Sequence, residues 1–162
     1  MSLRRLVPAG VLLALIVAAC GEGAPATDES PLTPLGDVRQ VMASVVDPAA
    51  GDYWDAVGWI VDSTGTEYIR PITEEEWEVV QDAAFALAES GNLLMMEGRA
   101  VDDGPWMGMV HAMMDAAMEG LAVAEARDEQ GVFDMGAEIY ATCTNCHLRY
   151  AVETLAPSAQ VD

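Results

Sequence analysis

The stretch Asp128–Tyr150, DEQGVFDMGAEIYATCTNCHLRY, contains the residues around which the rest of this chain has to fold. Within it, positions 143–147 read CTNCH, a C-x-x-C-H motif that is typical of covalent attachment of a c-type haem. On a helix, two thiols three residues apart lie on one face, so Cys143 and Cys146 can both reach the vinyl groups at one porphyrin edge. His147 follows directly and is carried beneath the ring, where an imidazole ligates iron. One motif predicts one covalent haem c.

The same motif has three other interpretations: a redox dithiol, a disulfide, or half of a zinc site. A redox dithiol usually lies between a strand and a helix, and the residues around Cys143 and Cys146 show no such context. A zinc site would need a fourth ligand, and the only other histidine of the chain is His111. The sequence therefore favours haem.

The N-terminus predicts export. Arg4 and Arg5 precede an apolar stretch over 6–19 that has the proportions of a signal peptide and is short for a membrane span. The stretch ends in Val17-Ala18-Ala19-Cys20, which resembles the bacterial lipobox. The resemblance implies a signal peptide over 1–19, cleavage before Cys20 and lipidation of that cysteine. An ordinary signal peptide cleaved elsewhere is the alternative. We therefore expect an exported protein, lipid-anchored to a membrane and facing the periplasm.

The cysteine count agrees with these two assignments. The chain has three cysteines, so one for lipid and two for haem leave none for a structural disulfide. Residues 21–36 are rich in glycine, proline, alanine and acidic residues, which favours a flexible tether. We therefore expect a lipidated cysteine and tether over 20–36, followed by one domain over 37–162.

The charge of the chain limits its partners. The formal net charge is −20, from 27 acidic residues against seven basic ones. Such a surface repels nucleic acid and anionic lipid headgroups. It favours redox protein partners with a basic docking patch. Solubility or adaptation to high salt is an equally good explanation of the acidity.

From residue 37 onward the sequence predicts helices and no strand. The first helix begins near Asp37, is kinked or split by Pro48, and ends before Gly65. The second starts at a Thr73-x-x-Glu76 capping box and stops at Gly91. The other two cover about 105–127, with proline in the first position, and 128–150. This pattern predicts an all-α antiparallel four-helix bundle that holds haem on its C-terminal helix.

The position of the motif, close to the C-terminus, is similar to that in the cytochrome c-prime family and its low-spin relatives. The first helix, with Arg39-Gln40-x-Met42, and the aromatic Tyr150 three residues after the histidine carry this resemblance. It implies that His147 is the proximal ligand and that a residue of the first helix faces the other side of the iron. In low-spin members that residue is a methionine, which implies Met42. Ala151 departs from the family, which often has a basic residue there.

The resemblance also makes Arg39 and Arg149 candidate contacts for the haem propionates. Met42 has competitors in this methionine-rich chain, and spacing alone does not choose among them. His111 is a conceivable axial ligand, but a histidine satisfied on the surface or in the core is the simpler interpretation. The methionines beside His111, at positions 107, 114 and 118, form one helix face, which is a hypothetical surface for a homodimer or a complex subunit. The tryptophans are expected in the core or around the haem.

These features predict a membrane-tethered monohaem c-type cytochrome that carries single electrons between periplasmic or membrane-bound redox partners. Two alternatives remain open: a haem protein that binds nitric oxide or carbon monoxide at a displaceable distal site, and a haem subunit of a larger electron-transfer complex. A methionine at position 42 favours electron transfer, and an apolar residue there would favour gas binding. No pattern of residues typical of an enzyme stands out.

Overall fold

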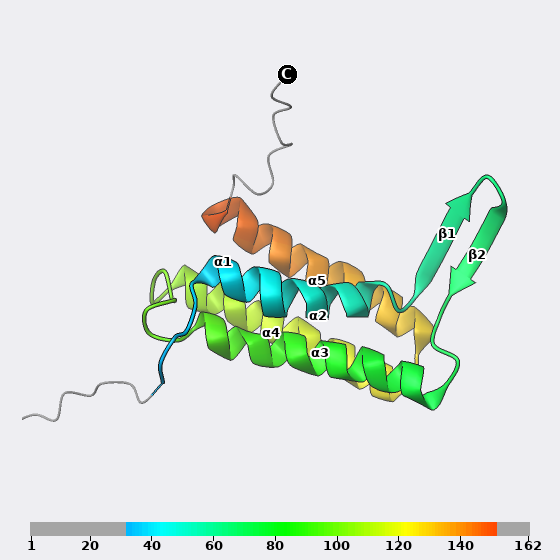
Figure 1. The fold of residues 1–162 in the computed structure, drawn as a ribbon, viewed down its shortest axis with the longest axis horizontal. Coiled ribbons are helices and arrows are strands. Elements are labelled where there is room, and N and C mark those ends of the chain that lie inside the picture. The colour runs from blue at the N-terminus through cyan, green and yellow to red at the C-terminus, as the bar shows by residue number, and fades with distance from the viewer. Residues whose placement is uncertain (1–31, 152–162) are drawn as a thin grey trace, which may run out of the picture.

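Residues 32–151 are described by the computed structural model, and they fold mainly into helices. The chain has three long helices and a first, interrupted helical segment, which lie side by side in Figure 1 with a small hairpin projecting from one end. A mainly helical chain is thus confirmed, whereas an entirely helical one is wrong. The elements are α1 Val38–Val41, η1 Met42–Val46, α2 Asp47–Trp54, β1 Gly58–Asp62, β2 Gly65–Ile69, α3 Glu74–Leu94, α4 Pro105–Glu125 and α5 Glu129–Tyr150.

The first helical segment, α1–η1–α2, contains a widened turn. It begins where predicted, because the Asp37 side chain accepts a hydrogen bond from the backbone N–H of Gln40 at 2.8 Å. In η1 the N–H of Asp47 bonds to the carbonyl of Met42, five residues earlier, which is the π-helical pattern. Pro48 has no N–H, and its ring would collide with the carbonyl four residues before it in a regular helix. The sequence predicts that Pro48 interrupts this helix, and the interruption is the wide π-helical turn of η1.

Residues 58–69 form a β-hairpin, so the prediction that the first helix continues towards Gly65 is wrong. β1 and β2 are antiparallel, with Gly58 opposite Ile69 and Asp62 opposite Gly65. At the turn, Asp62 accepts hydrogen bonds from the N–H groups of Thr64 at 2.7 Å and Gly65 at 3.2 Å. Gly65 has a φ of 147°, which a side chain would oppose. Because almost all strand residues are exposed, the strands lack the alternation that would have predicted them.

Side-chain contacts hold the hairpin against the beginning of α5. The Tyr68 hydroxyl donates to Glu129 at 3.1 Å, and Arg70 forms an ion pair with the same carboxylate at 3.1 Å. The Trp59 ring meets Phe133 edge-on, with 5.4 Å between centroids. The hairpin therefore lies at the opposite end of α5 from the C-x-x-C-H motif (Figure 1).

The starts of the long helices follow the predicted caps. The N–H of Glu76 donates to the Thr73 hydroxyl at 3.2 Å, while the Glu76 carboxylate accepts from the N–H of Thr73 at 2.9 Å, which completes the capping box of α3. Asp128 caps α5 by accepting from the N–H of Gly131 at 3.0 Å. These local hydrogen bonds explain why the sequence located the helix starts well.

The predicted end of the second helix is wrong. Gly91 lies inside α3, which continues to Leu94, and it is buried against α4. A Cβ atom built at Gly91 would lie 2.4 Å from Cγ of Met114. The glycine therefore allows two helices to approach closely instead of ending one.

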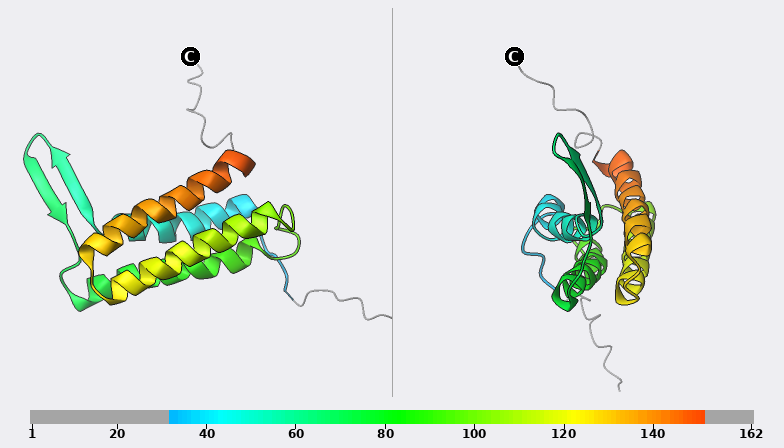
Figure 2. Two further views of the ribbon diagram at one scale, coloured as in Figure 1. Left: turned by 180° about the vertical axis from the view of Figure 1, so that it is seen from behind. Right: turned by 90° about the vertical axis from the view of Figure 1, so that its right-hand side faces the viewer.

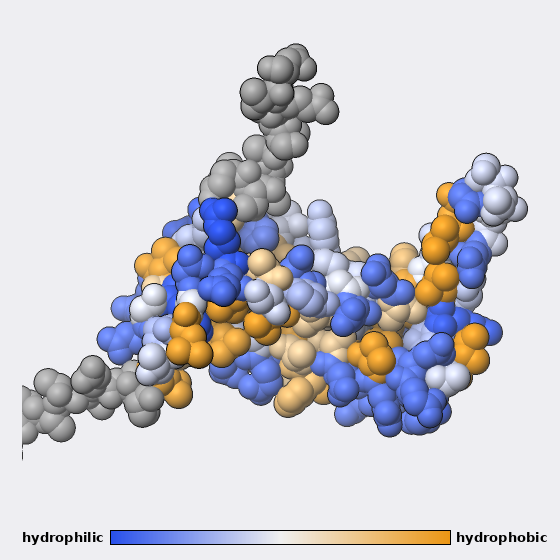
Figure 3. All heavy atoms as spheres, viewed as in Figure 1, coloured by the Kyte–Doolittle hydropathy of each residue, from blue (hydrophilic) through white to orange (hydrophobic). Residues whose placement is uncertain are grey.

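The helices pack side by side around a shared core. α4 packs against α3 and α5, and α2 packs against α3 and α5 (Figure 2). The hydroxyl of the buried Tyr53 donates to the carbonyl of Gly120 at 3.2 Å, which fixes α2 on α4. On the face drawn in Figure 3, apolar side chains gather along the hairpin and at the end of the molecule where α1 begins. Within residues 32–151, no helix is both long and apolar enough to cross a bilayer.

Candidate functional site

An apolar cavity of about 270 Å³ lies between the first helical segment, α4 and the C-terminal half of α5. All three functional residues of the motif line it from α5, namely Cys143, Cys146 and His147. Each of the three is half-buried. The cavity thus brings the motif together with residues about a hundred positions earlier in the chain.

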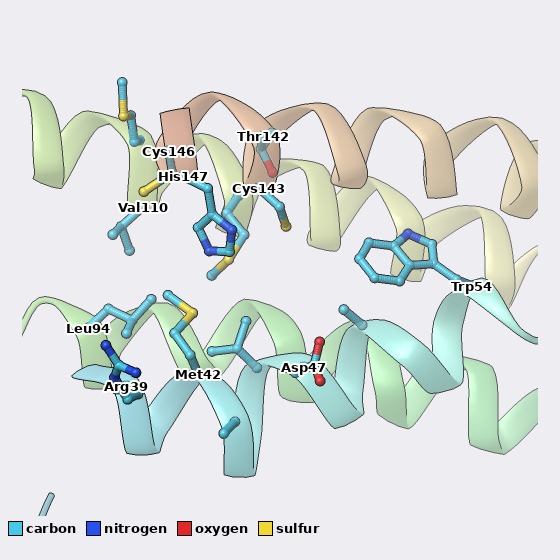
Figure 4. A pocket seen from close by; sticks show the side chains of 15 residues that line it. Arg39, Met42, Asp47, Trp54, Leu94, Val110, Thr142, Cys143, Cys146 and His147 are labelled. Atoms are coloured by element: carbon cyan, nitrogen blue, oxygen red, sulfur yellow. The ribbon is translucent and has the colours of Figure 1, made fainter. Parts of the chain in front are cut away.

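His147 and Met42 face one another across this cavity. In Figure 4 the imidazole points from α5 towards the first helical segment, and the Met42 thioether points from η1 towards α5. Imidazole and thioether are the pair of side chains that ligates haem iron in methionine-ligated c-type cytochromes. The geometry is therefore compatible with axial ligation from both walls.

The wide turn of η1 helps to align the wall that carries Met42. Met42, Val46, Ala50 and Trp54 all line the cavity and follow one another at steps of four residues. In a regular α-helix, such residues drift around the axis by about 40° per step. A wider turn takes up part of that drift, so that the four side chains stay on one face. π turns inserted into α-helices are frequent at functional sites.

The structure also narrows the choice among the methionines. Only two other methionines line the cavity among the described residues, Met109 and Met113, and both belong to α4. Met113 is buried in the core, with 6% of its surface exposed. The remaining competitors lie outside this cavity: Met95, Met96, Met107, Met114, Met118 and Met135.

A second cavity of about 360 Å³ adjoins the first at the end of α5. Four residues line both cavities: Arg39, Met42, Cys146 and His147. Space therefore extends to either side of the Met42–His147 pair. A flat ligand held between these two side chains would reach into both cavities, next to the thiols of the motif. The residues present fit a haem.

The pKa values of the two half-buried thiols are shifted away from thiolate formation. Burial raises the pKa of the Cys143 thiol, and it also raises the pKa of the Cys146 thiol. A redox-active dithiol needs the opposite, since a lowered pKa supplies the attacking thiolate. The site therefore gives no support to the redox interpretation of the motif.

The two predicted propionate contacts differ in their positions. Arg39 is exposed and lines both cavities, at their rim. Arg149 lines neither cavity, and its guanidinium lies over the ring of Tyr150, 5.4 Å from the centroid. The structure thus brings Arg39, but not Arg149, to the cavity wall. Asp47 also lines the first cavity, and its charge contributes to the raised pKa of Cys143.

Trp54 ties the first helical segment to α5 beside the cavity. Its indole N–H donates to the carbonyl of Gly136 at 2.9 Å, and its ring meets Tyr140 edge-on at 5.9 Å between centroids. Trp106 lines the second cavity. Trp77 and Trp106 are buried in the core, as predicted, and Trp54 packs against it, whereas Trp59 is exposed in the hairpin, with 54% of its surface accessible.

Three further predictions concern residues away from the cavities. Cys20, the expected lipidation site, lies outside the described residues. His111 is exposed on α4 and lines neither cavity. On the methionine-rich face beside it, Met107 and Met114 pack against the core and Met118 is exposed. In residues 32–151, no three His, Cys, Asp or Glu side chains form a group that could hold a metal ion.

Several residues of the site carried no signal in the sequence. Asp47 and Val110 line the first cavity, and Val101 lines the second. Only the packing of the helices brings these residues to the cavities, because the sequence around each of them does not indicate a site. One signal was available, because Pro48 predicts a disturbed turn just after Met42.

The chain matched no protein-family profile, no curated protein and no solved structure.

Proposed function

We propose that this chain is a membrane-tethered monohaem c-type cytochrome that transfers single electrons. Its domain would be a four-helix bundle in which Cys143 and Cys146 hold the haem through thioethers. His147 and Met42 would be the axial ligands of the iron. The observation that carries the proposal is the position of Met42 and His147 on opposite walls of one apolar cavity, which both cysteines also line.

The residues of the cavity have separate roles in this proposal. When bound, the haem supplies a one-electron ferric–ferrous couple. The two cysteines fix the group to α5, and His147 approaches it from the same helix. Met42 offers a neutral thioether, which favours the ferrous state and raises the potential. The apolar walls of η1 and α4 exclude water from the space between the ligands.

Charge at the rim of the cavities would orient the group. Arg39 lines both cavities and is the better placed partner for a propionate. Arg149 lies two residues after His147 on α5, over the ring of Tyr150, and remains the second candidate. Asp47 also lines the first cavity and follows Met42 along the chain, whereas Arg39 precedes it. The Asp47 carboxylate would favour the ferric state, because a nearby negative charge stabilises the additional positive charge of ferric iron.

The proposal includes export and anchoring. A signal peptide over 1–19 and lipidation at Cys20 would confine the domain to a membrane surface facing the periplasm, which raises its local concentration near membrane-bound redox partners. Partners with a basic patch would meet the acidic surface, since the chain carries 27 acidic residues and seven basic ones.

Visible spectra of the exported protein test the ligand assignment. We expect the wild type to be low-spin and six-coordinate and to leave added carbon monoxide unbound. Met42→Leu keeps the side-chain volume but removes the sulfur, so it should give a high-spin, gas-reactive haem. Met109→Leu makes the same change elsewhere in the cavity wall and should leave the spectrum of the wild type.

Two results would reject the assignment. A wild type that is already high-spin and binds carbon monoxide would exclude Met42 as a ligand. A spectral change in Met109→Leu but not in Met42→Leu would assign the sulfur to α4 instead. Covalent attachment is tested separately, by denaturing electrophoresis with haem staining. The wild-type chain should keep its haem in the gel, and a variant with serine at Cys143 and Cys146 should lose it.

Gas binding is the second candidate function. Met42 lines both cavities, so displacement of its thioether would give a diatomic ligand room beside the iron on that side. If micromolar nitric oxide displaces the Met42 thioether in the wild type, the result would favour gas binding over electron transfer.

A further inference from the structure

One carboxylate joins three parts of the chain at the end of α5. Asp102 belongs to the 95–104 connection between α3 and α4. One of its oxygens accepts from the N–H groups of Gly104 at 2.9 Å and Trp106 at 3.0 Å, at the start of α4. The other oxygen accepts from the hydroxyl of Tyr150, the last residue of α5. Asp102 therefore ties the connection both to α4 and to the helix that carries the motif.

The same contacts border the second cavity. Val101, next to Asp102, lines it together with Trp106 and Tyr150, and Met42 and His147 line it as well. Val101 is otherwise exposed, with 59% of its surface accessible. Moving the connection away from α5 would thus open one wall of the space beside the two axial candidates.

Tyr150 is itself held in a defined orientation. Its ring meets Trp106 edge-on, with 5.1 Å between centroids and 78° between planes. The indole N–H of Trp106 in turn donates to the carbonyl of Leu94 at 3.0 Å. Tyr150 lies three residues after His147, so that both side chains project from neighbouring turns of one helix face. Fixing Tyr150 therefore restrains the turn that carries His147.

The bond between the two side chains is strengthened by charge. The hydroxyl of Tyr150 is the main reason why the pKa of Asp102 is held below its usual value, and the nearby Arg149 adds to this. An ionised acceptor makes the hydrogen bond stronger than a neutral one.

We infer that the Tyr150–Asp102 hydrogen bond is a latch, which holds the 95–104 connection on α5, restrains His147 and limits the access of small ligands to the second cavity. The inference rests on the proposed haem site. Both residues are positioning residues, because they act through the loop and through the last turn of α5. The latch makes gas access a property of the loop as well as of Met42.

Tyr150→Phe tests the latch because it removes the hydroxyl and keeps the ring on Trp106. Tyr140→Phe is the matched control, a similar change at an exposed position of the same helix. We expect hydrogen exchange of the amides of residues 95–104 in the haem-loaded protein to accelerate about ten- to hundredfold in Tyr150→Phe, the range for losing a hydrogen bond to a charged group. In the Met42→Leu background, where the haem is expected to bind carbon monoxide, adding Tyr150→Phe should also make that binding faster. Asp102→Asn should have at least as large an effect, because Asp102 accepts on both oxygens and an amide keeps only one acceptor, so either the Tyr150 bond or the two backbone bonds are lost with the charge.

Unchanged exchange in Tyr150→Phe, or unchanged carbon monoxide binding when Tyr150→Phe is added to Met42→Leu, would overturn the latch. Exchange that rises equally in the buried part of α3 would also overturn it, because Tyr150 would then support the whole fold and not the connection. The exchange comparison does not depend on Met42 as a ligand. A high-spin wild type with a faster-exchanging connection in Tyr150→Phe would therefore reject the ligand assignment and keep the latch.

Discussion

Tyr53 gives the chain a stability that should depend on alkaline pH. Its side chain is 1% exposed, and its hydroxyl donates to the carbonyl of Gly120 at 3.2 Å. Burial raises the pKa of Tyr53 from 10.0 to about 12. Tyr53→Phe removes the titrating group and the hydrogen bond but keeps the ring in the core.

The sign follows from the protons bound in each state. Between pH 10 and 12, Tyr53 of the unfolded chain loses its proton while the folded protein keeps it. The contribution of this proton is complete below about pH 10 and falls as the pH rises towards the folded pKa. Each pKa unit corresponds to about 1.4 kcal/mol, so the free energy of unfolding should fall by about 2–3 kcal/mol over this range.

The expected result is a crossover between wild type and Tyr53→Phe. At neutral pH the variant should be less stable by about 0.5–1.5 kcal/mol, since it lacks one hydrogen bond. Near pH 12 it should be the more stable of the two, because only the wild type must suppress ionisation. Urea unfolding, followed by circular dichroism at several pH values from 8 to 12, measures both differences.

Tyr140→Phe is the control for the crossover. Tyr140 lies on α5 with 61% of its side chain exposed, so its loss should leave the pH dependence of the wild type. The other tyrosines and the residues of the proposed haem site titrate alike in wild type and variant, and their contributions cancel in the difference. Parallel stability curves for wild type and Tyr53→Phe across this range would refute the reasoning.

Two further predictions concern helix stability. Thr73→Ala removes the hydroxyl that accepts from Glu76 in the capping box, so it should lower the free energy of unfolding by about 1 kcal/mol in urea titrations; an unchanged midpoint would mean that the cap contributes nothing. Gly120→Ala places a Cβ atom 2.9 Å from the Tyr53 oxygen, and this overpacking, about 1–3 kcal/mol, should outweigh the gain in helix propensity. Gly108→Ala, with no heavy atom within 4 Å of its Cβ in the same helix, should raise the melting temperature instead, and equal shifts for the two glycines would contradict the argument.

The parts of the fold that the sequence predicted well are those set by local hydrogen bonds. Asp37, Thr73 and Asp128 each cap a helix at the residue that their side chains suggested. Gly91 shows the limit of such reasoning. Glycine is common after helix ends, but here it is buried where α3 meets α4, and the sequence near position 91 contains no information about Met114.

The hairpin was missed for a different reason. Trp59, Ile60 and Val61 are all more than half exposed, so that neither face of the sheet is buried. Without a buried face, a strand has no period of two for the sequence to display. Asp62 and Gly65 are typical turn residues, so the sequence did contain a signal for the hairpin turn. The apolar residues before Asp62 outweighed it, because they favoured a continued helix.

The sequence by itself determined how the three motif residues lie relative to one another on α5. Cys143, Cys146 and His147 are neighbours along one helix, and helix geometry alone fixes their relation. Only the tertiary structure decided which of the many methionines faces His147 and which arginine reaches the cavity rim. Met42 and Arg39 lie more than a hundred residues earlier, so their approach depends on how η1 packs against α5 and on the wide turn before Pro48. Local spacing cannot encode such a contact, because it is made by the sum of packing over the whole core.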